Sequence, residues 1–383
     1  MKTLRPLLLL SMALLMLFTA CHDDPTPEPR VAGQTVVVLM PWSFSLKPYF
    51  EKNIDDMAEV IASGGLANER VVVCLASSQL KSTLVELRGE QGRCVRDTIE
   101  VFNNINFTAA SNITKLLASV ERAAPAHHYA LIMAGHGMAW LPAGTVPVQM
   151  MSRIKKGYLT RWIGGYTRDL QIEISTLAEG ISLAGMHMDY ILFDDCYMSS
   201  VEVAYDLREV TDYVIGCPTE IMALGFPYSR CFRYLLGSPD YQRLCETFYD
   251  FYSHYEVACG TVAVTDCREL DALADRARAI NAAFPTTQEH NEDIQQMDGF
   301  SPPLFYDLGD TYAHLCPDDA LQEAFNKQLE RAVPYKASTS YYYSAYGGQY
   351  IIKYYSGLNT SQTSENSCAA DWRNTKWAQA VMK

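Results

Sequence analysis

The sequence lacks several features that define large functional classes. Its 383 residues contain no cysteine or histidine pairs at zinc-site spacing and no D-x-D-x-D-G loop for calcium. They also contain no basic run and no basic stretch interleaved with aromatic residues, and the formal net charge is −13. Nucleic-acid binding requires clustered lysine and arginine to neutralise phosphates, so no nucleic-acid partner is expected. Repeats of about 20 to 50 residues are absent as well, which excludes solenoids and propellers.

What is present indicates a globular protein with a large core. Hydrophobic residues make up 49% of the chain and charged residues 20%. At roughly 150 residues per domain, the length predicts two domains, or one large domain with an elaboration. The eleven cysteines are scattered, which is not the pattern of a disulfide scaffold, and most are expected to be buried as small hydrophobic residues.

The N-terminus is typical of an export signal. Lys2 and Arg5 precede an apolar stretch at 7–18, which is shorter than the roughly 20 residues needed to span a bilayer. Small residues then lead into Cys21, and the F-T-A-C sequence at 18–21 resembles the bacterial lipobox. We therefore expect a signal peptide at 1–20 and lipidation of Cys21, with ordinary secretory cleavage as the alternative.

A short tether is predicted after the lipidated cysteine, over residues 21–33. Three prolines and three acids fall within 22–29, and such a segment has little to bury. Acidic residues directly after the cysteine resemble the surface-export signal of some Gram-negative anaerobes. The expected location is the outer membrane, with the protein either on the cell surface or facing the periplasm.

The body of the chain alternates predicted strands and helices. Near-continuous apolar runs are typical of strands covered on both faces, and they occur at 36–40, 71–76, 129–134, 190–193, 213–217 and 261–264. Helical patterns occur at 50–61, 113–120, 175–184, 199–207, 240–254, 269–284 and 318–333. This order predicts an α/β fold with a mostly parallel sheet and helices on both faces, over residues 34–287. Residues 288–383, with a tyrosine-rich hairpin at 341–355, are expected to form an elaboration packed on that core.

Two of the predicted strands end in residues suited to catalysis. The strand at 129–134 is followed by Gly135, His136 and Gly137, and the strand at 190–193 leads to Cys196. In such sheets ligands bind beyond the carboxyl ends of the strands, and neighbouring strands lie about 4.8 Å apart. A thiol needs a base to become a thiolate, and a facing imidazole supplies one. A buried hydrophobic cysteine remains the alternative for Cys196.

The same segments resemble the clostripain family of cysteine peptidases, which have a caspase-like fold. The A-G-H-G sequence at 134–137 and F-D-D-C-Y-M-S at 193–199 are similar to the family's His-Gly and Asp-x-Cys signatures. Residues 36–39, 160–165 and 218–228 extend the likeness. The resemblance implies a three-layer sandwich with a mostly parallel central sheet.

The resemblance also implies roles for individual residues. Cys196 would attack the scissile carbonyl, and His136 would protonate the leaving amine. The backbone N–H groups of Gly137 and Cys196 would bind the oxyanion. Family members mostly cleave after arginine or lysine, and Asp194 matches the acid that binds those side chains. Glu220 is the candidate for a second such acid.

Two further residues near the predicted site have alternative interpretations. Asp195 either adds charge to the substrate pocket or caps the following helix. Trp140, close behind the histidine, either lines the site or packs in the core.

Clostripain-like enzymes are often zymogens, which suggests a role for the basic segment at 148–161. Its candidate self-cleavage positions are Arg153, Lys155, Lys156 and Arg161, with a plain solvated loop as the alternative. The sequence requires no cofactor, and calcium is expected from the family resemblance only.

These observations predict an exported, lipid-anchored cysteine endopeptidase that cleaves protein or peptide substrates after arginine or lysine. One alternative is a catalytically silent caspase-like lipoprotein that binds peptides or glycans. Another is ligation or transfer chemistry on the same two residues, which would require water to be kept from the acyl-enzyme.

Overall fold

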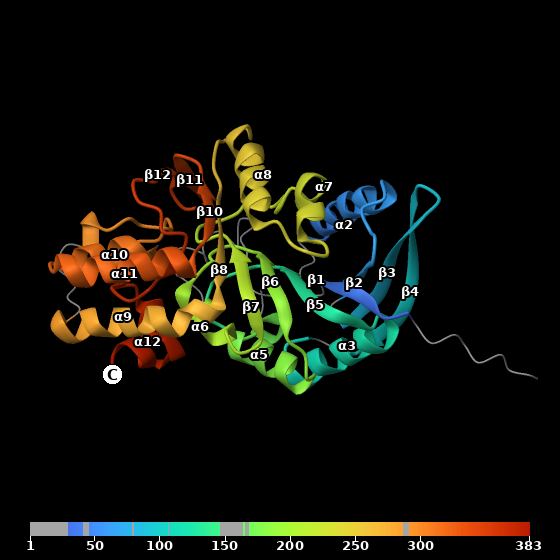
Figure 1. The fold of residues 1–383 in the computed structure, drawn as a ribbon, viewed down its shortest axis with the longest axis horizontal. Coiled ribbons are helices and arrows are strands. Elements are labelled where there is room, and N and C mark those ends of the chain that lie inside the picture. Colours follow the sequence, from blue (N-terminus) through green and yellow to red (C-terminus); the bar gives the residue numbers. More distant parts are fainter. Residues whose placement is uncertain are drawn as a thin grey trace, which may run out of the picture. The chain divides into compact units, whose positions relative to one another are not determined.

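A computed structural model gives the fold (Figure 1) for residues 30–40, 46–78, 80–105, 107–145, 164, 168–285 and 291–383. Residues 31–383 form one compact unit. Cys21 and the basic positions Arg153, Lys155, Lys156 and Arg161 lie outside the described residues. Across the part that is described, no helix is both long enough and apolar enough to cross a membrane.

The centre of the 31–383 unit is a nine-stranded sheet in the order β10-β8-β7-β6-β5-β1-β2-β3-β4. The strands are β1 (Ala32–Met40), β2 (Glu69–Ser78), β3 (Lys81–Glu90), β4 (Arg93–Asn103), β5 (Ala126–Ala134), β6 (Met188–Asp194), β7 (Thr211–Gly216), β8 (Thr261–Asp266) and β10 (Tyr335–Ser338). Strands β2, β1, β5, β6 and β7 pair in parallel, whereas β3, β4, β8 and β10 are added antiparallel at the two edges. The mostly parallel sheet predicted from the sequence is confirmed.

The sequence patterns identified the buried strands and missed an edge hairpin. All six apolar runs lie wholly or almost wholly within β1, β2, β5, β6, β7 and β8. Strands β3 and β4 were not predicted, because charged residues interrupt them and much of β4 is exposed, so neither contains a continuous apolar run. Strand β1 begins at Ala32, which lies within the segment predicted to be the tether. The predicted tether therefore extends too far, because Ala32 already pairs with Ala126 of β5.

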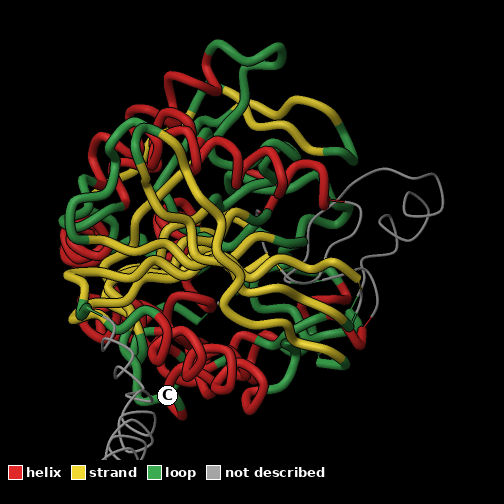
Figure 2. The backbone as a smooth tube through the Cα atoms, turned by 90° about the vertical axis from the view of Figure 1, so that its right-hand side faces the viewer, coloured by secondary structure: helices red, strands yellow, loops and turns green. Residues whose placement is uncertain are grey.

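Helices cover both faces of the sheet (Figures 1 and 2). One face carries α2 (Lys47–Ala62), α7 (Tyr228–Cys231) and α8 (Tyr241–Ser253), and the other carries α3 (Ala110–Ala123), α5 (Ile174–Leu183) and α6 (Val201–Leu207). The predicted periodicity of α2 is confirmed, since Phe50, Ile54, Met57 and Ile61 are all buried. Single turns of 3-10 helix occur at Arg168–Leu170, Phe232–Leu235, Cys267–Glu269, Asn291–Asp293, Ser367–Ala369 and Trp372–Asn374.

The C-terminal region contributes directly to the central sheet, because β10 pairs with β8. Its helices are α9 (Leu270–Ala283), α10 (Leu308–Leu315), α11 (Asp319–Ala332) and α12 (Lys376–Val381). The predicted tyrosine hairpin is formed by β11 (Tyr341–Ser344) and β12 (Gly348–Ile351), and a small ladder joins β9 (Tyr306–Asp307) to β13 (Asn359–Thr360). The predicted boundary at 287 and 288 falls within 286–290, outside the described residues.

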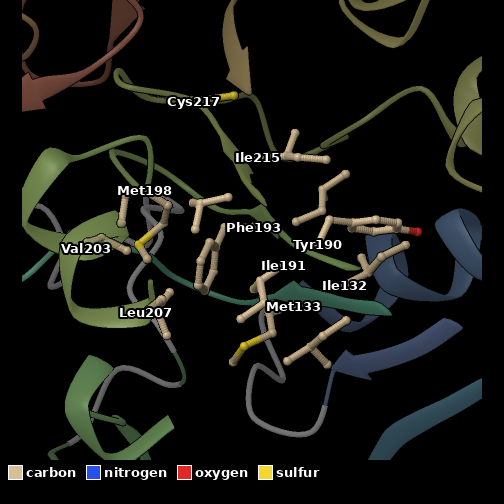
Figure 3. Close-up of a cluster of buried hydrophobic side chains, with 14 of the residues drawn as sticks. Ile132, Met133, Tyr190, Ile191, Phe193, Met198, Val203, Leu207, Ile215 and Cys217 are labelled. Carbon is tan, nitrogen blue, oxygen red and sulfur yellow. The ribbon is translucent and has the colours of Figure 1, made fainter. Parts of the chain in front are cut away.

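A hydrophobic cluster packs around β5 and β6 (Figure 3). Phe193 and Ile191 of β6, Met133 of β5 and Met198 beyond β6 are fully buried, and Leu207 of α6 packs with them. Burying one such side chain contributes about 1.5–3 kcal/mol, so the ends of these strands are firmly held. Of the ten cysteines in the described residues, eight are buried, as the sequence predicted.

Candidate active site

The sheet brings His136 and Cys196 to neighbouring strand ends. Strands β5 and β6 are adjacent and parallel, and Ala134 is opposite Asp194 in their register. His136 and Cys196 each follow two residues after these partners, so both lie just beyond the same edge of the sheet. Both side chains are buried, with exposed fractions of 0% and 3%. The predicted juxtaposition of the two loops is therefore present in the structure.

The histidine and cysteine loops are in direct contact. The Gly135 N–H donates to the Asp195 carboxylate across 2.5 Å. A Cβ atom added to Gly137 would lie 2.4 Å from the Cys196 carbonyl oxygen and 2.8 Å from the Asp195 Cβ. Such contacts are far shorter than van der Waals distances, so the loops can approach this closely only when residue 137 is glycine. The His136 N–H donates to the Gly164 carbonyl, which ties this loop to a second segment.

Gly137→Ala is expected to lower turnover at this candidate site by about 100-fold, because the new methyl group would push the cysteine loop away from the histidine loop. The measurement is steady-state hydrolysis of the peptide panel described under the proposed function, with circular dichroism to check the fold. Gly89→Ala is the matched control, since its Cβ would lie 3.2 Å from the Ile61 carbonyl, far along the chain from both loops. Equal activities of the two variants would show that the close contact is unimportant for the reaction.

The sulfur of Cys196 contacts one backbone unit of the loop after β7. The Ile221 N–H donates to Sγ at 3.4 Å, and the Cys196 thiol donates to the Ile221 carbonyl at 3.8 Å. An N–H donor favours a thiolate, whereas a carbonyl acceptor favours the neutral thiol, so this backbone unit can bond to the sulfur in either state. Burial favours neutral thiols, and it raises the pKa of Cys245 to about 12 and that of Cys259 to about 11. Sequence reasoning did not identify Ile221, because its contribution comes from the backbone.

The turn that follows Cys196 has an unusual backbone. Tyr197 has a φ of +64°, in the left-handed region that tyrosine rarely adopts. Its N–H donates to the Thr219 carbonyl, and the Ser199 N–H donates to the Cys217 carbonyl. Such strain costs about 1–3 kcal/mol and persists only where surrounding contacts impose it. The loop after β7 supplies part of that support.

The Asp194 side chain packs against the loop at 225–228 and is hydrogen-bonded to it. Its carboxylate is buried and accepts hydrogen bonds from the Phe226 N–H at 3.1 Å and the Tyr228 hydroxyl at 3.3 Å. Gly225 lies so close that a Cβ there would be 2.2 Å from Oδ2, and its φ is +69°. The position of this acid is therefore set by three residues of one loop.

Asp195 joins the two catalytic loops through its bond to Gly135. The alternative that it caps the following helix is wrong, because α6 begins at Val201 and its N-cap is Ser200. The intervening residues 196–199 form the turn, so the helix starts too late for Asp195 to reach its first N–H groups.

Glu220 is hydrogen-bonded within the chain. Its carboxylate accepts bonds from the Tyr197 hydroxyl at 2.8 Å, from the Ser344 hydroxyl and from the Ala345 N–H at 3.1 Å. Burial and the nearby Glu220 charge raise the pKa of Tyr197 well above its usual range, so the phenol remains a donor. Burial also raises the pKa of Asp298, which faces Glu220, to about 7. The structure thus places Glu220 between the turn that follows Cys196 and the β11-β12 hairpin.

Trp140 packs in the core close to the histidine loop. Only 7% of its surface is exposed, and its indole N–H donates to the Ser361 hydroxyl at 3.0 Å. Within the described residues, no group of three or more histidine, cysteine or acidic side chains is arranged to hold a metal ion.

A buried thiol and imidazole at adjacent parallel strand ends, in a sheet covered by helices on both faces, define a cysteine peptidase with a caspase-like fold. The sequence model of the clostripain family matches residues 38–378, and the chain belongs to this family. It is a clostripain-family cysteine peptidase, as its sequence motifs predicted.

Solved structures agree with this assignment. A secreted C11 cysteine protease from Bacteroides thetaiotaomicron, "iotapain", is 41% identical, with a TM-score of 0.86 over 92% of this chain and 100% of its own. A clostripain from Bacteroides thetaiotaomicron in complex with the peptide inhibitor BTN-VLTK-AOMK is 47% identical, with a TM-score of 0.57 over 57% of this chain and 99% of its own. An inactive zymogen C11 protease from Parabacteroides distasonis is 27% identical, with a TM-score of 0.78 over 93% of this chain and 99% of its own. No match was found among curated proteins.

Proposed function

We propose that this peptidase cleaves peptide bonds after lysine or arginine, with Cys196 as nucleophile and His136 as its acid–base partner. The observation that carries the proposal is the register of β5 and β6, which places both residues two positions beyond paired strand ends. The Ile221 N–H, 3.4 Å from the Cys196 sulfur, would donate to the thiolate once it forms. Peptidase-family membership favours this function over a catalytically silent binding module.

The proposed reaction uses only groups of this chain and water. The Cys196 thiolate attacks the scissile carbonyl carbon, and the carbonyl electrons move to the oxygen, which the N–H groups of Gly137 and Cys196 would stabilise. The His136 imidazolium then protonates the leaving amine as the C–N bond breaks. Water, deprotonated by His136, hydrolyses the thioester and regenerates the thiol. Calcium remains an expectation from the family resemblance and takes no part in these steps.

Asp194 is the proposed determinant of basic specificity. It lies two residues before Cys196, and its carboxylate is held in place by Phe226 and Tyr228. A buried carboxylate attracts an ammonium or guanidinium group strongly. The peptide bound to the 47% identical relative is written VLTK and so ends in lysine, which supports a basic preference here. Glu220 is proposed as a second such acid, and its oxygens, like those of Asp194, accept hydrogen bonds within the chain.

We also propose that the protein is exported, anchored by a lipid and activated by its own cleavage. The signal and lipobox residues that end at Cys21 support an outer-membrane lipoprotein, and a 41% identical relative is described as secreted. Cleavage at Arg153, Lys155, Lys156 or Arg161 would fit the enzyme's own preference. A 27% identical relative described as an inactive zymogen supports this activation step.

The test is a panel of fluorogenic peptides that end in lysine, arginine, aspartate or leucine, given to a chain that starts after Cys21. We expect hydrolysis of the lysyl and arginyl peptides to exceed that of the others by at least about 100-fold in kcat/KM. Mass spectrometry of the same samples reports any cut within 148–161. Preferential cleavage of the aspartyl or leucyl peptide, or no cleavage even after the segment is nicked and calcium is added, would overturn the proposal.

A further inference from the structure

A segment near the C-terminus lies directly against the nucleophile turn. Residues 357–361, called here the C-terminal strap, include β13 and form a parallel bridge between Asn359 and Ser200. The Ser199 hydroxyl donates to the Gly357 carbonyl at 2.8 Å, and the Asn359 N–H donates to the Ser199 carbonyl at 2.9 Å. The strap is more than 150 residues from the turn in sequence, so only the tertiary fold brings them together.

The side chain of Asn359 links two loops of the candidate site. The residue is fully buried, and its Nδ2 donates to the Tyr197 carbonyl at 3.1 Å and to the Pro218 carbonyl at 2.8 Å. Tyr197 is the strained residue that follows Cys196, and Pro218 lies three residues before Ile221, whose N–H contacts the sulfur. One primary amide therefore connects the turn that follows Cys196 to the loop whose Ile221 backbone contacts the sulfur.

The other end of the strap contacts the histidine loop and is itself anchored. The Ser361 hydroxyl accepts the indole N–H of Trp140, four residues after His136. The buried Glu202 carboxylate of α6 accepts bonds from the Thr360 hydroxyl at 2.7 Å, the Ser361 N–H at 3.2 Å and the Trp372 indole at 2.6 Å. A carboxylate with several charge-assisted bonds is a strong anchor, so the strap is fixed where it meets both loops.

We propose that Asn359 is a positioning residue for the Cys196 nucleophile. Its side chain fixes the position of the Tyr197 turn relative to the loop that carries Ile221. This inference rests on the proposed function of Cys196. The left-handed Tyr197 backbone persists only while its neighbours impose it, and Asn359 supplies a bond to its carbonyl. Without the amide, the turn relaxes and the sulfur moves relative to His136. A displacement of about 1 Å at a reacting atom costs on the order of 100-fold in rate.

The test compares Asn359→Ala with Asn281→Ala in the chain that starts after Cys21. Asn281 is also a buried amide: its Nδ2 donates to the Tyr312 hydroxyl at 3.2 Å and the Val381 carbonyl at 3.1 Å, and its Oδ1 accepts from the Gln362 amide at 2.9 Å. None of these partners belongs to the histidine loop, the cysteine loop or the strap. Steady-state kinetics on a lysyl peptide, the melting temperature and the rate of Cys196 alkylation by iodoacetamide are measured for both. Asn359→Ala is expected to lose about 100-fold in kcat with KM within about threefold, and to alkylate more slowly. Asn281→Ala is expected to keep kcat within about threefold at a comparable loss of melting temperature.

The outcomes separate this inference from the proposed function. If the wild-type chain cleaves lysyl peptides but the two alanine variants lose kcat equally, the positioning role is overturned and the proposed function stands. If the wild type cleaves no peptide, the proposed function fails on its own. Should Asn359→Ala not fold, Asn359→Ser takes its place, since a hydroxyl keeps one donor and is expected to lose about tenfold in kcat. A serine variant with wild-type kcat and alkylation rate would also overturn the inference.

Discussion

Cys196→Ala is expected to lower kcat/KM for lysyl and arginyl peptides by at least about 10⁴-fold. The alanine side chain cannot form the thioester, and the donors that remain give only the residual catalysis of an oxyanion site. The buried sulfur has a volume close to that of a methyl group, so the fold and melting temperature should change little. The measurement is hydrolysis of the two basic peptides at matched protein concentrations, together with loss of labelling at the peptide that contains residue 196.

Cys245→Ala is the matched control for this substitution. Cys245 is a buried thiol in α8, and burial raises its pKa to about 12, so it remains protonated near neutral pH. It should keep kcat/KM within about threefold of the wild type. A Cys196→Ala protein that retains a tenth or more of the activity would assign the reaction to another nucleophile and remove the basis of the proposed mechanism.

The second large effect is expected at Asp194. Asp194→Asn should lower kcat/KM for lysyl and arginyl peptides by about 10²–10³-fold and change cleavage of a leucyl peptide by less than about tenfold. Losing one partner of a buried charge pair costs about 2–5 kcal/mol. The amide is isosteric, and its oxygen can still accept the Phe226 N–H, so the loop at 225–228 should stay in place. The measurement is the ratio of basic to neutral cleavage across the same panel.

Asp189→Asn tests whether any charge on β6 has this effect. Asp189 lies on the same strand, but its partly exposed carboxylate pairs with His128 at 3.0 Å, far from the cysteine loop in the strand register. The basic-to-neutral ratio should be unchanged in this variant. An Asp194→Asn enzyme with the wild-type ratio would mean that another group binds the basic side chain, and Glu220 would then be the next residue to replace.

The sequence alone predicted the buried part of the fold and the chemistry at its edge. Parallel strands such as β1 and β6 are covered on both faces, so hydrophobic burial requires continuous apolar runs that are visible in one dimension. The motifs around His136 and Cys196 directly follow such strands, and that local arrangement allowed their juxtaposition to be predicted. The edge hairpin of β3 and β4 carried no comparable signal, because an exposed strand does not need to be apolar throughout.

Only the tertiary structure decided what surrounds these two residues. The Ile221 N–H at the sulfur is a backbone group, which any residue type supplies, so no sequence pattern marks it. Asn359 reaches the nucleophile turn from 162 residues away, and Glu220 is occupied by donors from the β11-β12 hairpin 124 and 125 residues downstream. Hydrogen bonds between such distant segments depend on how the chain closes on itself rather than on local composition. The sequence therefore determined which strand ends meet, through hydrophobic periodicity and short-range motifs, whereas packing and long-range hydrogen bonding determined how firmly the nucleophile is held there.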